Sequence, residues 1–313
     1  MNNLYNETKY IMNKYGISAN KSLGQNFLVN ENAVETIIES ANITKVDLVI
    51  EIGPGLGTLT SRLLEKAGKV VCIELDNRMI EILNDRFKLY DNFELIHGDV
   101  LKVNLNKIIN DLFVQQGEYC RGRTLGRPVA TKEYEKEHIN TLNSLKHTKI
   151  VANLPYYITT PIIMKLLEEK LNIESITVMI QKEVAERLVA LPGTKDTGAI
   201  TYSVYYYAEA EKILDVENSS FIPEPNVTST VIKLKVRKQP PVKIEDEKLM
   251  FKIIKQAFMQ RRKTLVNALS NLNIFKTKEE IIEMLKSLGI DEKIRGEALT
   301  IEQYANLANN IKK

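Results

Sequence analysis

Apolar residues occur along this chain in short runs that alternate with segments of helical spacing. The runs lie at 47–52, 69–73, 93–97, 150–152, 175–180 and 229–236, and the helical spacing at about 32–41, 58–67, 161–169 and 182–190. Short continuous runs are typical of strands buried on both faces, and apolar positions three or four residues apart are typical of helices. The alternation predicts an α/β fold, a Rossmann-like doubly wound sheet with helices on both faces.

The remainder of the chain predicts a second, smaller domain. Residues 201–208, rich in Tyr and β-branched residues, indicate another strand. Gln239-Pro240-Pro241 then marks a linker. We expect a Rossmann-like catalytic domain over 1–240, which begins with an arm at 1–30, and a small all-helical domain over 241–313.

One segment between the third and fourth predicted strands has no apolar period. It extends from about 117 to 143 and includes Arg121-Gly122-Arg123. We expect a surface insertion. A basic loop of this kind can contact RNA, although a solvated loop is the favoured interpretation.

The composition is that of an ordinary soluble protein. Of the 313 residues, 44% are hydrophobic and 27% are charged, and the formal net charge is only +3. The overall charge therefore does not indicate a nucleic-acid partner. Its distribution is more informative, because residues 231–263 contain 11 Lys/Arg against 3 Asp/Glu.

Several classes of protein are disfavoured. Two cysteines cannot form a disulfide framework or a four-ligand zinc site, and we expect no metal site. No run approaches the roughly 20 apolar residues that span a bilayer, and the first ten residues lack a signal-peptide core. We expect a cytoplasmic protein without membrane contact, and a monomer because no long apolar seam is present.

Glycine and acidic residues follow the predicted strands where an open α/β sheet binds its ligand. Gly53, Gly55 and Gly57 follow the first strand, Glu74 ends the second and Asp99-Val100 follows the third. The glycines let the backbone approach a ligand, and an acid about 20 residues later suits a ribose diol. Asp99 can accept from an adenine amine while the Val100 amide donates to a ring nitrogen, although Asp99 also suits a helix N-cap.

A nicotinamide dinucleotide site is the competing interpretation of the glycine turn. Two details argue against it. Glu51 precedes the first glycine within the strand, and the spacing Gly53-x-Gly55-x-Gly57 differs from G-x-G-x-x-G.

Asn153-Leu154-Pro155-Tyr156 follows the fourth strand and predicts the chemistry. The Asn153 Oδ1 and the Leu154 carbonyl, held by Pro155, can accept both protons of an amine on a planar base. Tyr156 can stack on that base, and Phe221 is the candidate for its other face. Such bonds favour a tetrahedral nitrogen whose lone pair is aimed at an electrophile. If that electrophile is a sulfonium methyl, the rate comes mainly from positioning, and no catalytic His or Cys is needed. A plain strand-to-helix turn with an Asn cap is the alternative.

These motifs together resemble the KsgA family of small-subunit (16S) ribosomal RNA adenine N6-dimethyltransferases along essentially the whole chain. The matching segments are Lys21–Leu28, Glu51–Gly57, Gly98-Asp99, Asn153–Tyr156, Phe221–Val227 and Gln256–Leu265. The resemblance implies S-adenosylmethionine as cofactor. As substrate it implies two adjacent adenosines in the 3′-terminal hairpin loop of the RNA, within a pre-30S or 30S-like particle, with a role in subunit biogenesis.

The resemblance also assigns roles by position. Asn26 and Leu28 would contact the cofactor from the arm, Gly53 its methionine end, Glu74 its ribose and Asp99 its adenine, while Asn153 lies where cofactor and target meet. Arg261-Arg262-Lys263, on the first long helix of the small domain, would bind RNA phosphates, with a solvated helix face as the alternative. The 117–143 segment departs from the family by its length.

Three rival interpretations stay open. Large-subunit ribosomal RNA methyltransferases of the macrolide-resistance type share the chemistry, but their turn resembles Asn-Ile-Pro-Tyr. DNA adenine methyltransferases usually have an Asp- or Asn-Pro-Pro turn. A non-catalytic RNA-binding assembly factor can retain the fold, although the intact turn at 153–156 favours catalysis.

Overall fold

The continuous apolar runs form strands, as predicted, and most of these strands are buried. The computed structural model describes residues 3–119, 145–272 and 274–311. The strands in these ranges are β1 (Phe27–Leu28), β2 (Asp47–Ile52), β3 (Lys69–Glu74), β4 (Phe93–His97), β5 (His147–Asn153), β6 (Ser175–Gln181), β7 (Ala208–Val216), β8 (Phe221–Ile222) and β9 (Ser229–Val236). Every residue of β2 and β3 is buried, as expected for strands covered on both faces.

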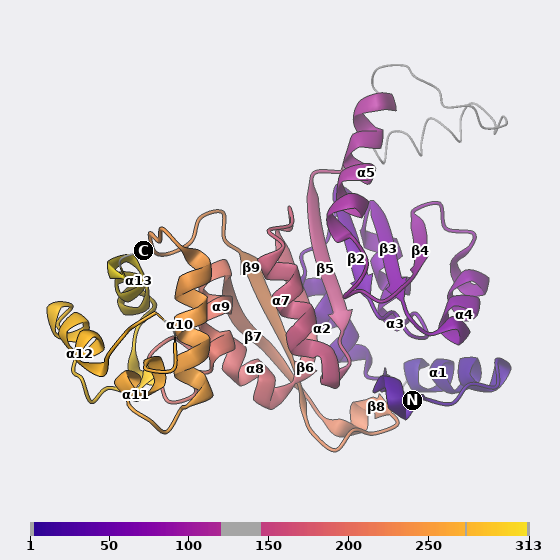
Figure 1. Ribbon diagram of the computed structural model, residues 1–313. Coiled ribbons are helices and arrows are strands. Elements are labelled where there is room, and N and C mark those ends of the chain that lie inside the picture. Colours follow the sequence, from indigo (N-terminus) through magenta and orange to yellow (C-terminus); the bar gives the residue numbers. More distant parts are fainter. Residues whose placement is uncertain (1–2, 120–144, 273, 312–313) are drawn as a thin grey trace. The chain divides into compact units, whose positions relative to one another are not determined.

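Seven strands form one sheet in the order β4-β3-β2-β5-β6-β9-β7 (Figure 1). β2 pairs in parallel with β3 on one side and β5 on the other, β4 and β6 extend the parallel part, and β9 pairs antiparallel with β6. The strand order therefore changes direction beside β2, and the carboxyl ends of β2 to β5 meet at one edge. Such a switch point is where open α/β sheets bind ligands.

The helices between strands β2 and β6 flank the sheet (Figure 1), and several helices of the chain begin at polar caps. In the described ranges the helices are α1 (Asn3–Lys14), α2 (Glu31–Ser40), α3 (Thr58–Lys66), α4 (Asn77–Phe87), α5 (Leu105–Tyr119), α7 (Thr159–Glu168), α8 (Lys182–Val189), α9 (Ala199–Tyr207), α10 (Glu247–Met259), α11 (Leu265–Leu269), α12 (Lys278–Ser287) and α13 (Ile301–Asn310). Asn30 and Asp76 cap α2 and α4 through side-chain bonds to backbone amides. None of the described helices is both long and apolar enough to cross a membrane.

The prediction of a strand at 201–208 is wrong, because nearly all of this segment lies in helix α9. Thr201 Oγ1 accepts a hydrogen bond from the Gly198 amide at 2.9 Å and so starts the helix. Tyr202 and Tyr206, four residues apart, then both enter one buried core. Burial at helical spacing outweighs the β-propensity of the segment.

Contacts divide the chain into two compact units. The first contains Met1–Lys182 and Glu211–Val236, and the second contains Glu183–Ala210 and Arg237–Lys313. The second unit thus includes α9, which the predicted boundary at 240 assigns to the catalytic domain. Its core joins α9 to the C-terminal helices, and the Tyr202 hydroxyl donates to the Leu299 carbonyl at 2.5 Å.

The predicted insertion at about 117–143 lies almost wholly outside the described residues. Helix α5 continues through Tyr119, so the first three positions of that segment are helical. The insertion stays a prediction.

Candidate active site

One open cavity in the first unit collects most of the predicted site residues at the carboxyl ends of β2 to β5. It contains about 1040 Å³ of empty space, which includes open solvent at its mouth. The predicted residues that line it are Asn26, Leu28, Gly53, Gly55, Glu74, Asp99, Val100, Asn153, Leu154, Pro155 and Tyr156. Segments from four strand ends and from the N-terminal arm therefore form one site.

Glu74 at the end of β3 is held in place by backbone amides. Its Oε2 accepts from the Gly55 amide at 3.1 Å, and its Oε1 accepts from the amides of Leu75 and Asp76 at 2.7 and 2.9 Å. Burial raises the pKa of this carboxyl, and the three donors oppose that shift. A fixed carboxylate at this edge is a suitable acceptor for two neighbouring hydroxyl groups.

The glycine turn after β2 has the backbone that only glycine adopts readily. Gly53, Gly55 and Gly57 all have positive φ, between 57° and 84°. Beside Gly53 no atom lies within 4 Å of where a Cβ would be. The turn therefore leaves open space at the point where its backbone faces the cavity.

Asp99 is not a helix N-cap, because a turn follows it and helix α5 begins only at Leu105. Its Oδ1 accepts from the Leu101 amide at 3.0 Å, which stabilises the turn after β4. Its Oδ2 lies 3.6 Å from the Nζ of Lys102, whose side chain is 85% exposed. The structure places Asp99 and Val100 on the cavity wall, and their contact with an adenine stays a prediction.

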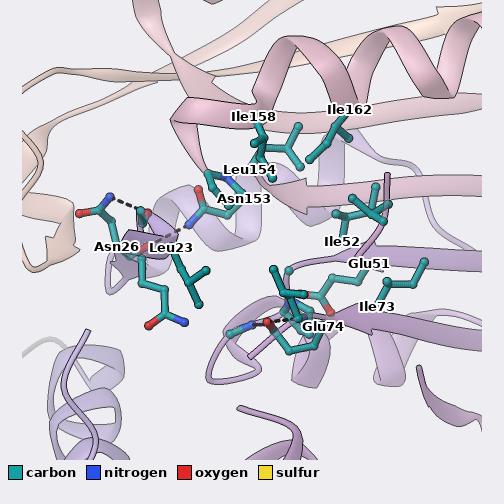
Figure 2. Close-up of a pocket in the computed structure, with 18 of the residues that line it drawn as sticks. Leu23, Asn26, Glu51, Ile52, Ile73, Glu74, Asn153, Leu154, Ile158 and Ile162 are labelled. Atoms are coloured by element: carbon teal, nitrogen blue, oxygen red, sulfur yellow. Dashed lines mark hydrogen bonds between the residues drawn. The ribbon is translucent and has the colours of Figure 1, made fainter. Parts of the chain in front are cut away.

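Asn153 ends β5 and faces both the cavity and the arm. Its Nδ2 donates to the Asn26 carbonyl at 3.1 Å (Figure 2). Because the amino group is used in this bond, Oδ1 is the atom that is left to accept from a ligand. No donor in the described part of the chain reaches that oxygen.

Hydrogen bonds also hold the rest of the turn, from Leu154 to Tyr156. The Leu154 amide donates to the Met179 carbonyl at 3.1 Å, and the Pro155 carbonyl accepts from the Thr159 hydroxyl at 3.0 Å. The Tyr156 hydroxyl lies 2.6 Å from Ser229 Oγ. Burial raises the pKa of the Tyr156 hydroxyl. These bonds hold the Leu154 carbonyl and the Tyr156 ring as parts of the cavity wall.

Phe221, the predicted second stacking ring, does not line the cavity. It is only 2% exposed and pairs with Leu28 where β8 meets β1. In this structure its ring belongs to the hydrophobic core. Its stacking role stays a prediction.

The other lining residues were not predicted as site residues, and among them are Gln25, Glu51, Leu75 and Tyr157. Glu51 is 1% exposed, and its Oε2 accepts from the Thr60 hydroxyl at 2.6 Å. Burial raises the pKa of Glu51 to about 7. An acid inside a buried apolar strand is unusual enough to have indicated a functional role from sequence, whereas Gln25 and Tyr157 carried no such signal.

The basic cluster in the second unit is not on a helix, contrary to the prediction. Helix α10 ends at Met259, and Arg261, Arg262 and Lys263 form the turn before Thr264, the N-cap of α11. Arg261 donates to Glu297 Oε2 at 2.6 Å and to the Lys195 carbonyl at 3.0 Å. The side chains of Arg262 and Lys263 are exposed and have no ion-pair partner among the described residues.

Comparisons with known proteins agree on one family. Residues 16–313 match the model of the family described as ribosomal RNA adenine dimethylase. The protein named ribosomal RNA small subunit methyltransferase A from Alkaliphilus metalliredigens is 48% identical, over 97% of this chain and 96% of its own length. The protein of the same name from Clostridioides difficile is 44% identical, over 98% and 96%.

Two solved structures resemble the fold over most of the chain. A dimethyladenosine transferase from Plasmodium falciparum has a TM-score of 0.67 and 26% identity, and the match covers 90% of this chain and 95% of that one. The 23S rRNA methyltransferase ErmE has a TM-score of 0.62 with 20% identity, covering 92% and 100%. At that identity, the second likeness concerns the fold alone.

Proposed function

Because this chain belongs to the ribosomal RNA adenine dimethylase family, we propose that it dimethylates two adjacent adenosines in the 3′-terminal hairpin loop of small-subunit ribosomal RNA. It is a ribosomal RNA adenine dimethyltransferase, and S-adenosylmethionine is its methyl donor. The acceptor is the exocyclic amine of each adenosine. The chain is 44–48% identical, over nearly its full length, to proteins named as small-subunit methyltransferases. This similarity favours small-subunit RNA over large-subunit RNA as the substrate.

The cavity fits the cofactor. When bound, S-adenosylmethionine supplies an electrophilic methyl group on a positively charged sulfur. Glu74 would hold the ribose hydroxyls, Asp99 and Val100 the adenine, and Asn26, Leu28 and the glycine turn the remainder. The buried carboxyls of Glu51 and Glu74 suit a cationic ligand, and the open space beside Gly53 gives room for its amino-acid end.

The observation that carries the catalytic proposal is the bond from Asn153 Nδ2 to the Asn26 carbonyl. It leaves Asn153 Oδ1 as an acceptor, beside the Leu154 carbonyl. The two oxygens would accept both protons of the target amine and favour a tetrahedral nitrogen with its lone pair free. Tyr156 would stack on the flipped base. Positioning and fixed acceptors would thus supply the rate without a strong base.

The second unit would bind the RNA backbone. Arg262 and Lys263 are the members of the cluster with free side chains for phosphates, since Arg261 is already paired. Ribosomal RNA is the substrate. We propose that the enzyme methylates it within a pre-30S or 30S-like particle in the cytoplasm. We propose that the protein acts as a monomer.

A transfer assay tests this function. Purified protein and labelled S-adenosylmethionine are incubated with small ribosomal subunits from a strain that lacks the modification, and the RNA is digested to nucleosides. We expect dimethyladenosine from the small-subunit RNA. Two methyl groups on the amine block base pairing, so reverse transcription should stop at two neighbouring positions near the 3′ end.

Two outcomes would overturn the proposal. Transfer to protein-free large-subunit RNA, with none to small subunits, would assign the chain to the resistance type. Binding of RNA without transfer to either would indicate an assembly factor on an enzyme's fold.

A further inference from the structure

The side chain of Gln25 connects the N-terminal arm to helix α4. Its Oε1 accepts from the Asn20 amide at 2.9 Å, and its Nε2 donates to Asp76 Oδ2 at 2.9 Å. The Gln25 amide also donates to the Asn20 carbonyl at 3.2 Å. The glutamine therefore closes the turn of the arm and attaches that turn to α4.

Asp76 connects this attachment to the predicted ribose site. It is 8% exposed and caps α4 by accepting from the Arg78 amide at 3.0 Å. Its own amide donates to Glu74 Oε1 at 2.9 Å. The residue that would bind the ribose and the residue that holds the arm are thus two positions apart and hydrogen-bonded.

The arm reaches the catalytic turn at its other end. Gly24, with φ of +61°, turns the chain, and Asn26 Nδ2 donates to the Gly24 carbonyl at 3.2 Å. The Asn26 carbonyl then accepts from Asn153 Nδ2 (Figure 2). Hydrogen bonds and the short backbone of the arm form a continuous connection from Glu74 through Asp76, Gln25 and Asn26 to Asn153.

We infer that Gln25 is a positioning residue for methyl transfer, which acts through the Asn26 carbonyl on the orientation of the Asn153 amide. This inference rests on the proposed function. An amide turned by 180° would present its NH₂ group to the target amine, and that group donates and cannot accept. The bond from Gln25 to Asp76 keeps the Asn26 carbonyl where it selects the productive orientation, so an ordered ribose site and an ordered catalytic amide go together.

A pair of variants tests the inference. Gln25→Glu sets a carboxylate against Asp76 and breaks the bond. At saturating S-adenosylmethionine and small subunits, we expect kcat to fall roughly 10- to 100-fold, the range that a displacement of about 1 Å costs, while the Kd for RNA is unchanged. The second variant, Gln25→Met, removes the same bond without adding a charge, and we expect a similar fall in kcat with an unchanged Kd for RNA.

Lys14→Ala is the matched control. It also removes a bond between the arm and α4, the ion pair to Asp85 at 3.2 Å, but this bond is not part of the connection, so kcat should not change. The inference is overturned if either Gln25 variant keeps the wild-type kcat. Failure of the wild type to methylate small subunits would instead refute the proposed function.

Discussion

The Asn153 amide bonds to the protein through Nδ2, and we propose that its Oδ1 accepts from the substrate amine. Nδ2 is bound by the Asn26 carbonyl, so the residue cannot rotate to suit an approaching base. Its orientation is set before the substrate arrives, which is the condition under which fixed dipoles lower a barrier most.

Asn153→Ala should therefore lower kcat by about 100- to 1,000-fold, the usual cost of one lost acceptor or donor at a reacting group. The variant keeps every predicted phosphate contact, so the Kd for RNA should stay within about twofold of wild type. Single-turnover methyl transfer and filter binding measure the two quantities. Equal losses in both would contradict the assigned role.

The buried carboxyl of Glu51 makes the stability of the protein depend on pH. Burial raises its pKa in the folded protein to about 7, against 4.5 for a glutamate in water. Between these values the folded protein carries a proton that the unfolded chain lacks, so the free energy of unfolding falls as pH rises from about 4.5 to 7 and the loss is complete above about 7.

Glu51→Gln removes this titration. Relative to wild type, the variant should gain up to about 3 kcal/mol in the free energy of unfolding at pH 8 and little at pH 4. Urea unfolding without cofactor at both pH values measures the difference. Parallel pH profiles for the two proteins would show that Glu51 titrates normally.

At the scale of elements, the glycine turn after β2 depends on two separate constraints. Gly53 and Gly57 both have positive φ. Only at Gly57 would an added Cβ overlap a neighbour, the Phe87 ring at the end of α4. One position tests backbone strain alone, and the other tests strain together with packing.

Gly53→Ala should therefore destabilise the protein by about 1–2 kcal/mol, the cost of a left-handed conformation. Gly57→Ala should cost a further 1–3 kcal/mol or so, because the core is overpacked. Urea unfolding without cofactor compares the two. Equal losses would mean that Phe87 moves aside at no cost.

Element order and the strand-end residues could be predicted from sequence, because buried strands and helices have distinct periods and parallel strands end at one edge. Gly53, Glu74, Asp99 and Asn153 all follow from this. Helix α9 could not be predicted, since a segment that is apolar on nearly every side has no informative period. Gln25 and the buried position of Phe221 depend on where the arm packs, which is long-range information absent from any local pattern.

At the scale of the whole molecule, cofactor and RNA contacts are predicted to be separable. Arg262→Ala with Lys263→Ala should weaken RNA binding and reduce the slope of log K against log salt by roughly 1 to 2. Cofactor affinity should be unchanged. Lys278→Ala with Lys286→Ala, two exposed lysines of α12, makes the same change in charge and is the control. Equal losses of RNA affinity in the two double variants would mean that binding depends only on the net charge of the protein.

The pairing of β1 with β8 joins segments far apart in the chain, and nearby Asn30 bonds to Ser220, 190 residues later. On the ribosome, at about 5–20 residues per second, the arm emerges roughly 10 to 40 s before its partner strand is synthesised. During that interval the arm can make its bonds to Asp76 and later to Asn153, but it lacks the strand that pairs with β1. We therefore expect newly made enzyme to bind its methyl donor with full affinity only after most of the first unit has been translated.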